Sequence, residues 1–392
     1  MIYLDNAATS FPKPDAVYDE IDRFGRTLAG NPGRGMHRMS RASEEAIARA
    51  RRAVASLVGA KRPERVIFTL NATDALNMAI KGVLRPGDHA VTSDLEHNSV
   101  SRPLVGLETR GVITLTRVRS EDDGRIDPAA LRAAMTPATR LVALSHASNV
   151  IGVVQDAAAL AAEAHRAGAL LLLDAAQSAG TIPIDVEGSG IDFLAFTGHK
   201  ALLGPMGTGG LVLRDGVDIE AWREGGTGGD SSSPTQPREL PHFLEGGTPN
   251  AVGLAGLAAG VRAVTERGVL EIGGHERQMG ARLAGILARS PRIRVLAAPA
   301  TVDARQRGRE GAIRASLGLV AFTIEGFSPQ EAAAILDERF GVAVRAGLHC
   351  APYVHRRHGL FPDGTVRASA GPFTTPAEID EAGRAILEIA EP

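Results

Sequence analysis

Short apolar runs alternate with segments of helical periodicity over the first half of the chain. This alternation predicts about seven strands, at 66–70, 89–93, 112–118, 141–146, 170–174, 193–197 and 210–213. It predicts helices at 15–29, 41–59, 73–83, 99–109, 128–135 and 157–167, with Ser40 as the N-cap of the second. Strands that alternate with helices imply an α/β fold with a mainly parallel sheet covered on both faces. The last strand follows its predecessor closely, which is compatible with an antiparallel pair.

The second half of the chain has a different pattern. Residues 223–250 are rich in glycine, serine and proline and lack apolar periodicity, so we expect a long loop. Long helices at 252–267 and 271–289 lead into a smaller α+β region. Its expected strands are 293–297, 319–324, 342–346 and 365–369, and its expected helices are 329–340 and 376–390. We therefore predict a large domain over 15–265 and a small domain formed by 1–14 and 266–392.

The composition excludes several classes of protein. A net charge of −2 gives no electrostatic reason to expect nucleic acid or an anionic membrane as a partner. The first residues lack a basic segment followed by an apolar one, and no apolar run is long enough to span a bilayer. The single cysteine excludes an internal disulfide and a zinc site with several thiolates, and we expect no metal. A cytoplasmic location is the default expectation.

One lysine stands out. The chain has 43 basic residues, but only four are lysine: Lys13, Lys61, Lys81 and Lys200. Lys200 follows a predicted buried strand, in a glycine-bounded turn at 196–205. A desolvated lysine can lose its proton and form a Schiff base, which arginine cannot. The alternative is an ordinary lysine in a surface loop.

Polar residues follow other predicted strands of the large domain. Thr73 opens a helix, where free backbone amides and a hydroxyl suit a phosphate, although an ordinary N-cap explains it as well. His97 and Asn149 follow the next strands, and a lone histidine in a loop is often a bystander. Asp174 ends an apolar strand, so its carboxylate should have a cationic partner, either Lys200 or a protonated ring nitrogen, unless it is a structural N-cap. Ligands gather at this edge of such sheets.

Taken together, these motifs resemble the pyridoxal-phosphate (PLP) enzymes of the class V aminotransferase group. The motifs occur in family order from residue 1 to about 390. They are Asp5-Asn6-Ala7-Ala8-Thr9, Asn71-Ala72-Thr73, Glu96-His97, Ser148-Asn149, Asp174-Ala175-Ala176-Gln177, Thr197-Gly198-His199-Lys200 and Gly247-Thr248-Pro249-Asn250. The segment from Arg345 to Ala351 is similar to the signature of cysteine desulfurases, in the branch shared with selenocysteine lyases. The resemblance implies the aspartate aminotransferase-like fold (fold type I).

The resemblance also implies roles for these residues. Lys200 would form the Schiff base with PLP, and Asp174 would pair with the pyridinium nitrogen. His97 would stack on the ring as a catalytic residue. Asn149 and Gln177 would contact the ring's O3′ side, and Ala72, Thr73, Thr197 and His199 would lie at the phosphate. Thr248 would reach the phosphate of the partner subunit, which implies a homodimer.

Substrate contacts follow from the same resemblance. Arg367 would bind the carboxylate of an amino-acid substrate through two hydrogen bonds. Arg345 and Arg34 would be further arginines of the active site, and Asn6 and Ala7 would line the substrate pocket. The expected substrate is L-cysteine or L-selenocysteine, and a protein acceptor for the sulfur is a possible partner.

Cys350 is the only thiol that could take sulfur from a substrate. Its neighbours are cationic or can become so, and this should stabilise the thiolate. These neighbours are Arg345, His349, His355, Arg356, Arg357 and His358. We expect residues 353–358 to extend the cysteine loop with bulk and charge. The alternative for a lone cysteine is a buried, unreactive side chain.

The leading hypothesis is a PLP-dependent cysteine desulfurase that converts L-cysteine to L-alanine and holds the sulfur on Cys350 as a persulfide. One alternative is a lyase for selenocysteine or cysteine sulfinate, for which the cysteine could be dispensable. Another is a different class V enzyme, such as an aminotransferase, a hydrolase or an epimerase, with an inert cysteine. A non-catalytic sulfur carrier on the same fold is a further alternative, but it would have no use for Lys200, Asp174 and Arg367 together.

Overall fold

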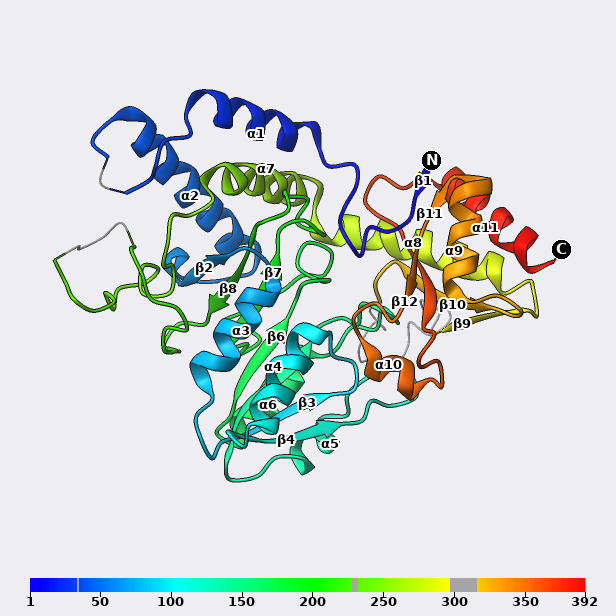
Figure 1. The fold of residues 1–392 in the computed structure, drawn as a ribbon, viewed down its shortest axis with the longest axis horizontal. Helices are drawn as coiled ribbons and strands as arrows, with labels where there is room; N and C mark the ends of the chain where they lie inside the picture. The colour runs from blue at the N-terminus through cyan, green and yellow to red at the C-terminus, as the bar shows by residue number, and fades with distance from the viewer. Residues whose placement is uncertain (34, 228–231, 297–315, 392) are drawn as a thin grey trace.

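A seven-stranded sheet forms the centre of the larger part of the protein in the computed structural model (Figure 1). The structure describes all residues except 34, 228–231, 297–315 and 392. Its strand order is β2-β8-β7-β6-β5-β3-β4. The strands are β2 Val66–Thr69, β3 His89–Ser93, β4 Thr114–Val118, β5 Thr139–Ser145, β6 Leu170–Asp174, β7 Phe193–Thr197 and β8 Gly209–Leu213. Only β8 runs against the others, so the predicted mainly parallel sheet with one antiparallel strand is confirmed.

Helices cover both faces of this sheet, as its continuous apolar strands require. Along β6, Leu171 and Leu173 face one core, and Leu172 faces the other. The helices α2, α6 and α7 contribute to the first core, whereas α3 and α4 contribute to the second (Figure 1). The helices around the sheet are α1 Asp15–Thr27, α2 Arg38–Leu57, α3 Ala72–Val83, α4 Asn98–Thr109, α5 Pro128–Ala133, α6 Ala157–Arg166 and α7 Ala251–Arg267, with a short 3₁₀ helix η1 at Pro63–Arg65.

A second, antiparallel sheet has the order β12-β13-β10-β9. Its strands are β9 Ile293–Leu296, β10 Leu319–Ile324, β12 Arg345–Gly347 and β13 Thr365–Ser369. The helices α8 Val269–Leu287, α9 Pro329–Phe340 and α11 Pro376–Ala390 share one apolar core with it, which includes Phe322 and Leu336. The long helix α8 runs from the large sheet to the small one (Figure 1). These features agree with a smaller α+β region, while the predicted domain boundaries remain a prediction.

Several predicted elements differ from the structure. The strand expected at 342–346 is two strands: β11 Val342–Ala343 pairs with β1 Ile2–Tyr3, and β12 joins β13. The N-cap of α2 is His37, whose ring Nδ1 accepts a hydrogen bond from the Ser40 backbone nitrogen at 3.3 Å, so the prediction of Ser40 as N-cap is wrong.

The segment after the cysteine is not a simple loop extension. It contains a helix, α10 Pro352–Arg357, which sequence periodicity could not reveal because it has fewer than two turns. The described part of 223–250 is loop and turn, as predicted. Among the described residues, no helix has both the length and the apolar character needed to cross a membrane.

Candidate active site

The predicted cofactor residues converge at one edge of the large sheet. The strands β2, β3, β5, β6 and β7 run in the same direction, so the segments after them meet at their carboxyl ends. A pocket of about 310 Å³ opens there. Nine of the predicted residues line it: Ala72, Thr73, His97, Asn149, Asp174, Gln177, Thr197, His199 and Lys200.

Lys200 extends from the turn after β7 into this pocket. Burial lowers its pKa to about 8; Asp174 acts in the opposite sense, while Arg367 and Arg345 lower the pKa further. A useful fraction of the amine is therefore neutral near physiological pH, as a nucleophile or base requires.

Hydrogen bonds that the sequence did not reveal hold the backbone just before Lys200. The His199 carbonyl oxygen accepts hydrogen bonds from the Ser10 backbone nitrogen at 2.9 Å, Thr9 Oγ1 at 3.0 Å, Ser10 Oγ at 3.2 Å and Lys13 Nζ at 3.3 Å. All four donors come from the N-terminal segment, which therefore fixes the turn that presents the lysine. Only the occurrence of Thr9, Ser10 and Lys13 within five positions could have drawn attention to it.

Asp174 is a buried carboxylate without a side-chain cation. Its Oδ1 accepts a hydrogen bond from the Ala176 backbone nitrogen at 3.0 Å, and burial raises its pKa. In the described part of the chain, no basic side chain lies within 4.0 Å of it, although Lys200 lowers its pKa from a greater distance. The predicted partners of Asp174 were Lys200 and a protonated ring nitrogen. The distances favour the second, a cation that is not part of this chain, such as a protonated pyridine nitrogen.

Another part of the pocket suits a phosphate group. Thr73 lies in the first turn of α3, whose N-cap Asn71 accepts a hydrogen bond from the Asp74 backbone nitrogen. The Thr73 hydroxyl lies 2.7 Å from Ser99 Oγ. His199 Nδ1 is buried without a hydrogen-bonding partner in the described structure, and burial, followed by the charge of Lys200, lowers the His199 pKa to about 4. A helix N-terminus with hydroxyls and an unsatisfied ring nitrogen fits an anion.

His97 presents a neutral ring. Burial, and then the charge of Lys200, lowers its pKa to about 4, and its Nδ1 accepts a hydrogen bond from the Ser99 backbone nitrogen at 3.1 Å. Beside it, Glu96 is fully buried and accepts hydrogen bonds from Ser93 Oγ and Ser145 Oγ. Burial raises the Glu96 pKa to about 7. Sequence reasoning gave Glu96 and Ser99 no role, although Glu96 lies within the recognised motif.

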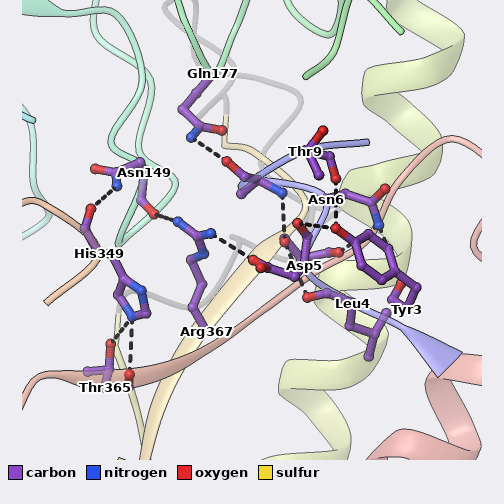
Figure 2. A network of polar contacts seen from close by, with 12 residues as sticks. Tyr3, Leu4, Asp5, Asn6, Thr9, Asn149, Gln177, His349, Thr365 and Arg367 are labelled. Carbon is purple, nitrogen blue, oxygen red and sulfur yellow. Dashed lines mark hydrogen bonds and ion pairs between the residues drawn. The ribbon is translucent and has the colours of Figure 1, made fainter. Parts of the chain in front are cut away.

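Arg367 is the centre of a buried polar network (Figure 2). Its Nη2 donates to Asp5 Oδ1 at 3.0 Å and its Nη1 donates to the Asn149 carbonyl oxygen at 2.9 Å, while Nε is buried and has no hydrogen-bonding partner among the described residues. Arg345 stands opposite Arg367 in the antiparallel pair β12-β13. Two cations on neighbouring strands repel each other, so this position favours an anion such as a carboxylate.

Asn6 and Ala7 lie in a small cavity beside this network. They line it together with Gln177 and Lys200. Gln177 Nε2 donates to the Ala7 carbonyl oxygen at 3.0 Å, so the N-terminal segment is tied to the cofactor pocket.

Cys350 lies in a tight turn between the two sheets. Both His349 and Cys350 have positive φ angles, +48° and +57°, which are uncommon for residues other than glycine. Two hydrogen bonds hold the turn: Asn149 Nδ2 donates to the His349 carbonyl oxygen at 2.6 Å, and the Asn98 backbone nitrogen donates to the Cys350 carbonyl oxygen at 2.7 Å. The side chain is exposed, so the alternative of a buried, inert cysteine does not apply.

Of the residues expected to be cationic around Cys350, the three histidines contribute no charge. Burial is the main cause that lowers the pKa of His349, to about 2, and it also lowers the pKa values of His355 and His358. These histidines are therefore neutral. Charge on Cys350 raises the pKa of both Lys200 and Arg367, although burial remains the main influence on each, so the thiol lies within electrostatic reach of both groups.

One predicted residue of the cofactor site is not brought to the pocket. Thr248 is exposed in the loop before α7 and does not line it. Arg34 lies outside the described residues.

The chain matches the family described as Aminotransferase class-V over residues 2–381. It is 34% identical over 397 residues to a probable cysteine desulfurase of Methanothermobacter thermautotrophicus, an alignment that covers 99% of this chain and 94% of that protein. A probable cysteine desulfurase of Pyrococcus abyssi is 32% identical, with 97% and 92% coverage.

Solved structures agree with these sequence relatives. The apo cysteine desulfurase of Thermococcus onnurineus superimposes with a TM-score of 0.90 and 31% identity, covering 100% of this chain and 94% of that chain. The cysteine desulfurase CsdA of Escherichia coli gives a TM-score of 0.87 and 29% identity, with 99% and 95% coverage. Class V aminotransferases use pyridoxal 5′-phosphate and have fold type I, and the pocket described above fits that cofactor. The chain belongs to the class V aminotransferase family.

Proposed function

We propose that this protein is a cysteine desulfurase, which converts L-cysteine to L-alanine and retains the sulfur on Cys350. The observation that carries the proposal is that the only thiol of the chain stands exposed within electrostatic reach of Lys200 and Arg367. An inert cysteine would have no reason to occupy a turn held by Asn149 of the cofactor pocket and by Asn98 beside His97.

The pocket offers each part of PLP a matching group. Lys200 would bind its aldehyde carbon, Asp174 its ring nitrogen and His97 its ring face. Asn149 and Gln177 would lie at its O3′ side. The phosphate would be held by the amides and hydroxyls contributed by Ala72, Thr73, Thr197 and His199. When bound, PLP withdraws electron density from the α-carbon of an attached amino acid.

The side chains of the protein would then divide the reaction between them. Arg367 and Arg345 bind the substrate carboxylate. The neutral amine of Lys200 removes the proton from Cα. The Cys350 thiolate attacks the substrate sulfur, so that a sulfur–sulfur bond forms while the Cβ–sulfur bond breaks and leaves its electron pair on the carbon side. Protonation of that carbon, together with return of a proton from Lys200 to Cα, gives alanine, and Cys350 carries the persulfide.

The quaternary structure and the fate of the sulfur belong to the same proposal. An exposed Thr248 is compatible with a homodimer in which this residue reaches the phosphate of the partner subunit. Arg34 would be a further substrate contact. A reductant or an acceptor protein must remove the persulfide sulfur, and the cytoplasm provides both. We propose that the enzyme works there.

A product assay tests the proposal. Purified protein with PLP, L-cysteine and a reductant should release alanine and sulfide in equal amounts, and Cys350→Ala should abolish both. The absorbance of the bound cofactor should be lost in Lys200→Ala but retained in Cys350→Ala. Formation of a 2-oxo acid or of D-cysteine instead of alanine would overturn the proposal. So would alanine production from L-cysteine that survives Cys350→Ala.

A further inference from the structure

The helix α10, which begins two residues after Cys350, is attached to the large sheet by two arginines. The Arg117 guanidinium carbon lies 3.8 Å from the centre of the Tyr353 ring. The Arg117 Nη1 also donates to the Ser93 carbonyl oxygen at 2.6 Å. Arg117 thus joins the strand β4, the end of β3 and the helix α10 in one contact.

Arg357 makes the second attachment, at the other end of α10. Its Nη2 donates to Asp122 Oδ1 at 2.6 Å and to the Ser120 carbonyl oxygen at 3.3 Å. Its Nε is buried, makes no hydrogen bond within the part of the chain that the structure describes, and lies 4.0 Å from the Asp94 carboxylate. Asp94 is itself fixed, because its Oδ1 accepts a hydrogen bond from the Ser120 backbone nitrogen at 3.0 Å.

Both attachments lead to the segment that carries His97. Ser93, Asp94 and Asn98 belong to residues 93–98, which connect β3 to α4. Each of the three contacts the cysteine-bearing region: Ser93 through Arg117, Asp94 through Arg357, and Asn98 by its hydrogen bond to the Cys350 carbonyl oxygen. One short stretch of backbone therefore positions both His97, which would stack on the cofactor ring, and the Cys350 thiol.

We propose that Arg117, Tyr353 and Arg357, here called the α10 clamp, are positioning residues that place Cys350 for its attack on the substrate sulfur. The inference rests on the proposed function. Lys200 belongs to the large sheet, whereas Cys350 follows β12 of the small sheet, so the two groups need a rigid connection to act on one substrate. A displacement of about 1 Å can cost about 100-fold in rate.

Without the clamp, the segment that carries His97 keeps its own hydrogen bonds, from the Leu95 backbone nitrogen to Ser93 Oγ and from the Ser99 backbone nitrogen to His97 Nδ1. Loss of the clamp should therefore affect the step that needs the thiol, and this makes it testable. Cysteine sulfinate offers a leaving group that departs as sulfur dioxide, with the electron pair of the broken bond left on carbon, so its conversion to alanine needs no attack by Cys350. Arg117→Ala should lower alanine production from L-cysteine by about 10- to 100-fold. The same variant should leave turnover of cysteine sulfinate within twofold of the wild type.

Matched variants separate positioning from a general loss of structure. Arg119→Ala removes an exposed arginine two positions along the chain and should behave as wild type with both substrates. Tyr353→Phe keeps the ring face under Arg117 and should retain activity, whereas Tyr353→Leu should resemble Arg117→Ala. Arg357→Ala should show the same split between substrates. On the Cys350→Ala background, Arg117→Ala should have no further effect on cysteine sulfinate.

Hydrogen exchange of the PLP-loaded protein provides a readout other than activity. Amides of residues 350–357 should exchange faster in Arg117→Ala than in Arg119→Ala. The proposal fails if Arg117→Ala matches Arg119→Ala with L-cysteine, or if it lowers turnover of both substrates equally. If the wild type makes no alanine from L-cysteine, the proposed function is wrong. If, in addition, the amides of 350–357 exchange equally fast in Arg117→Ala and Arg119→Ala, the clamp is wrong as well.

Discussion

The cofactor pocket and the Cys350 turn are built in different ways. The pocket consists of segments that each follow a strand of the parallel sheet, so neighbouring strands bring their polar residues together. The Cys350 turn has left-handed backbone angles, and side chains and backbone groups from distant parts of the chain hold it. Asn149, for example, is 200 positions away from the carbonyl group that it binds.

The functional groups of the pocket follow strands of the large sheet, whereas the Cys350 thiol lies in a turn that follows a strand of the small sheet. A lysine or an aspartate at the end of a strand has a well-defined position, because hydrogen bonds to the neighbouring strands hold that strand in the sheet. A nucleophile on another sheet has no such support and depends on individual contacts. Variants of the pocket should therefore affect every substrate, whereas variants around the turn should affect only substrates that need the thiol.

Lys200→Ala should have the largest effect. Without the amine no base remains at the α-carbon, so turnover of both L-cysteine and cysteine sulfinate should fall by about 100- to 10,000-fold. Alanine release, measured by amino-acid analysis, checks this. Lys81→Ala, which removes an exposed lysine, is the control and should retain full activity. Loss with only one of the two substrates would break the distinction between pocket and turn.

Asn149→Ala tests the residue that belongs to both regions. Its side chain donates to the His349 carbonyl oxygen, while its backbone carbonyl oxygen accepts from Arg367 and is unaffected by the change. We expect alanine production from L-cysteine to fall by about 10- to 100-fold because the turn loses its hydrogen bond from Asn149 and keeps the one from Asn98.

Alanine production from cysteine sulfinate should fall less in Asn149→Ala. This substrate does not need the Cys350 turn, so only the contact between Asn149 and the cofactor is lost. Steady-state rates with both substrates measure the split. Asn31→Ala, at an exposed asparagine, is the control. Equal losses with both substrates would mean that Asn149 acts on the cofactor alone.

Sequence reasoning went furthest where a position follows directly from one strand. Lys200 and Asp174 could be placed at the same edge of the sheet because Asp174 ends an apolar strand and Lys200 stands three residues after another. It failed where a partner is remote: nothing near His199 indicates that Ser10 and Lys13 hold its carbonyl oxygen.

The small sheet gave the same lesson. The strand predicted at 342–346 was wrong because its first half pairs with the two-residue strand β1, which is too short for any periodicity. The helix α10 and its attachments were missed because Arg117 and Asp94 are more than 230 positions away from it. Pairings that close such long loops are decided by packing, which a local pattern does not contain.

His349→Gln should change how stability depends on pH. The folded protein keeps His349 neutral because burial lowers its pKa to about 2, whereas an unfolded chain binds a proton near pH 6.5. The free energy of unfolding must therefore fall as the pH drops below 6.5, by up to about 1.4 kcal/mol per pH unit for this one residue.

Glutamine does not titrate, so the variant should show a slope that is shallower by about this amount between pH 6 and pH 4.5. Urea unfolding at several pH values measures the slope. His242→Gln, at an exposed histidine, is the control and should leave the slope unchanged. A slope for His349→Gln that coincides with the wild type would show that the ring takes up a proton in the folded protein.

Thr365→Val should have the smallest effect, and it isolates the support beneath the turn. His349 Nε2 lies 3.1 Å from the Thr365 carbonyl oxygen and 3.0 Å from Thr365 Oγ1, and His355 Nε2 lies 3.4 Å from the same hydroxyl. If His349 donates to the carbonyl oxygen, the hydroxyl is free to donate to His355, whose Nδ1 already donates to the Ala351 carbonyl oxygen at 3.0 Å. This assignment gives both histidines the neutral state that their lowered pKa values require.

Valine has nearly the same shape as threonine but leaves His355 Nε2 without a donor. The free energy of unfolding should fall by about 1 kcal/mol. Alanine production from L-cysteine should fall by two- to threefold, because His349 still reaches the carbonyl oxygen and the turn keeps its hydrogen bonds from Asn149 and Asn98. Thr365→Ser retains the hydroxyl and should restore both values. A loss of more than tenfold would mean that the turn depends on the histidine pair beneath it more than on Asn149 and Asn98.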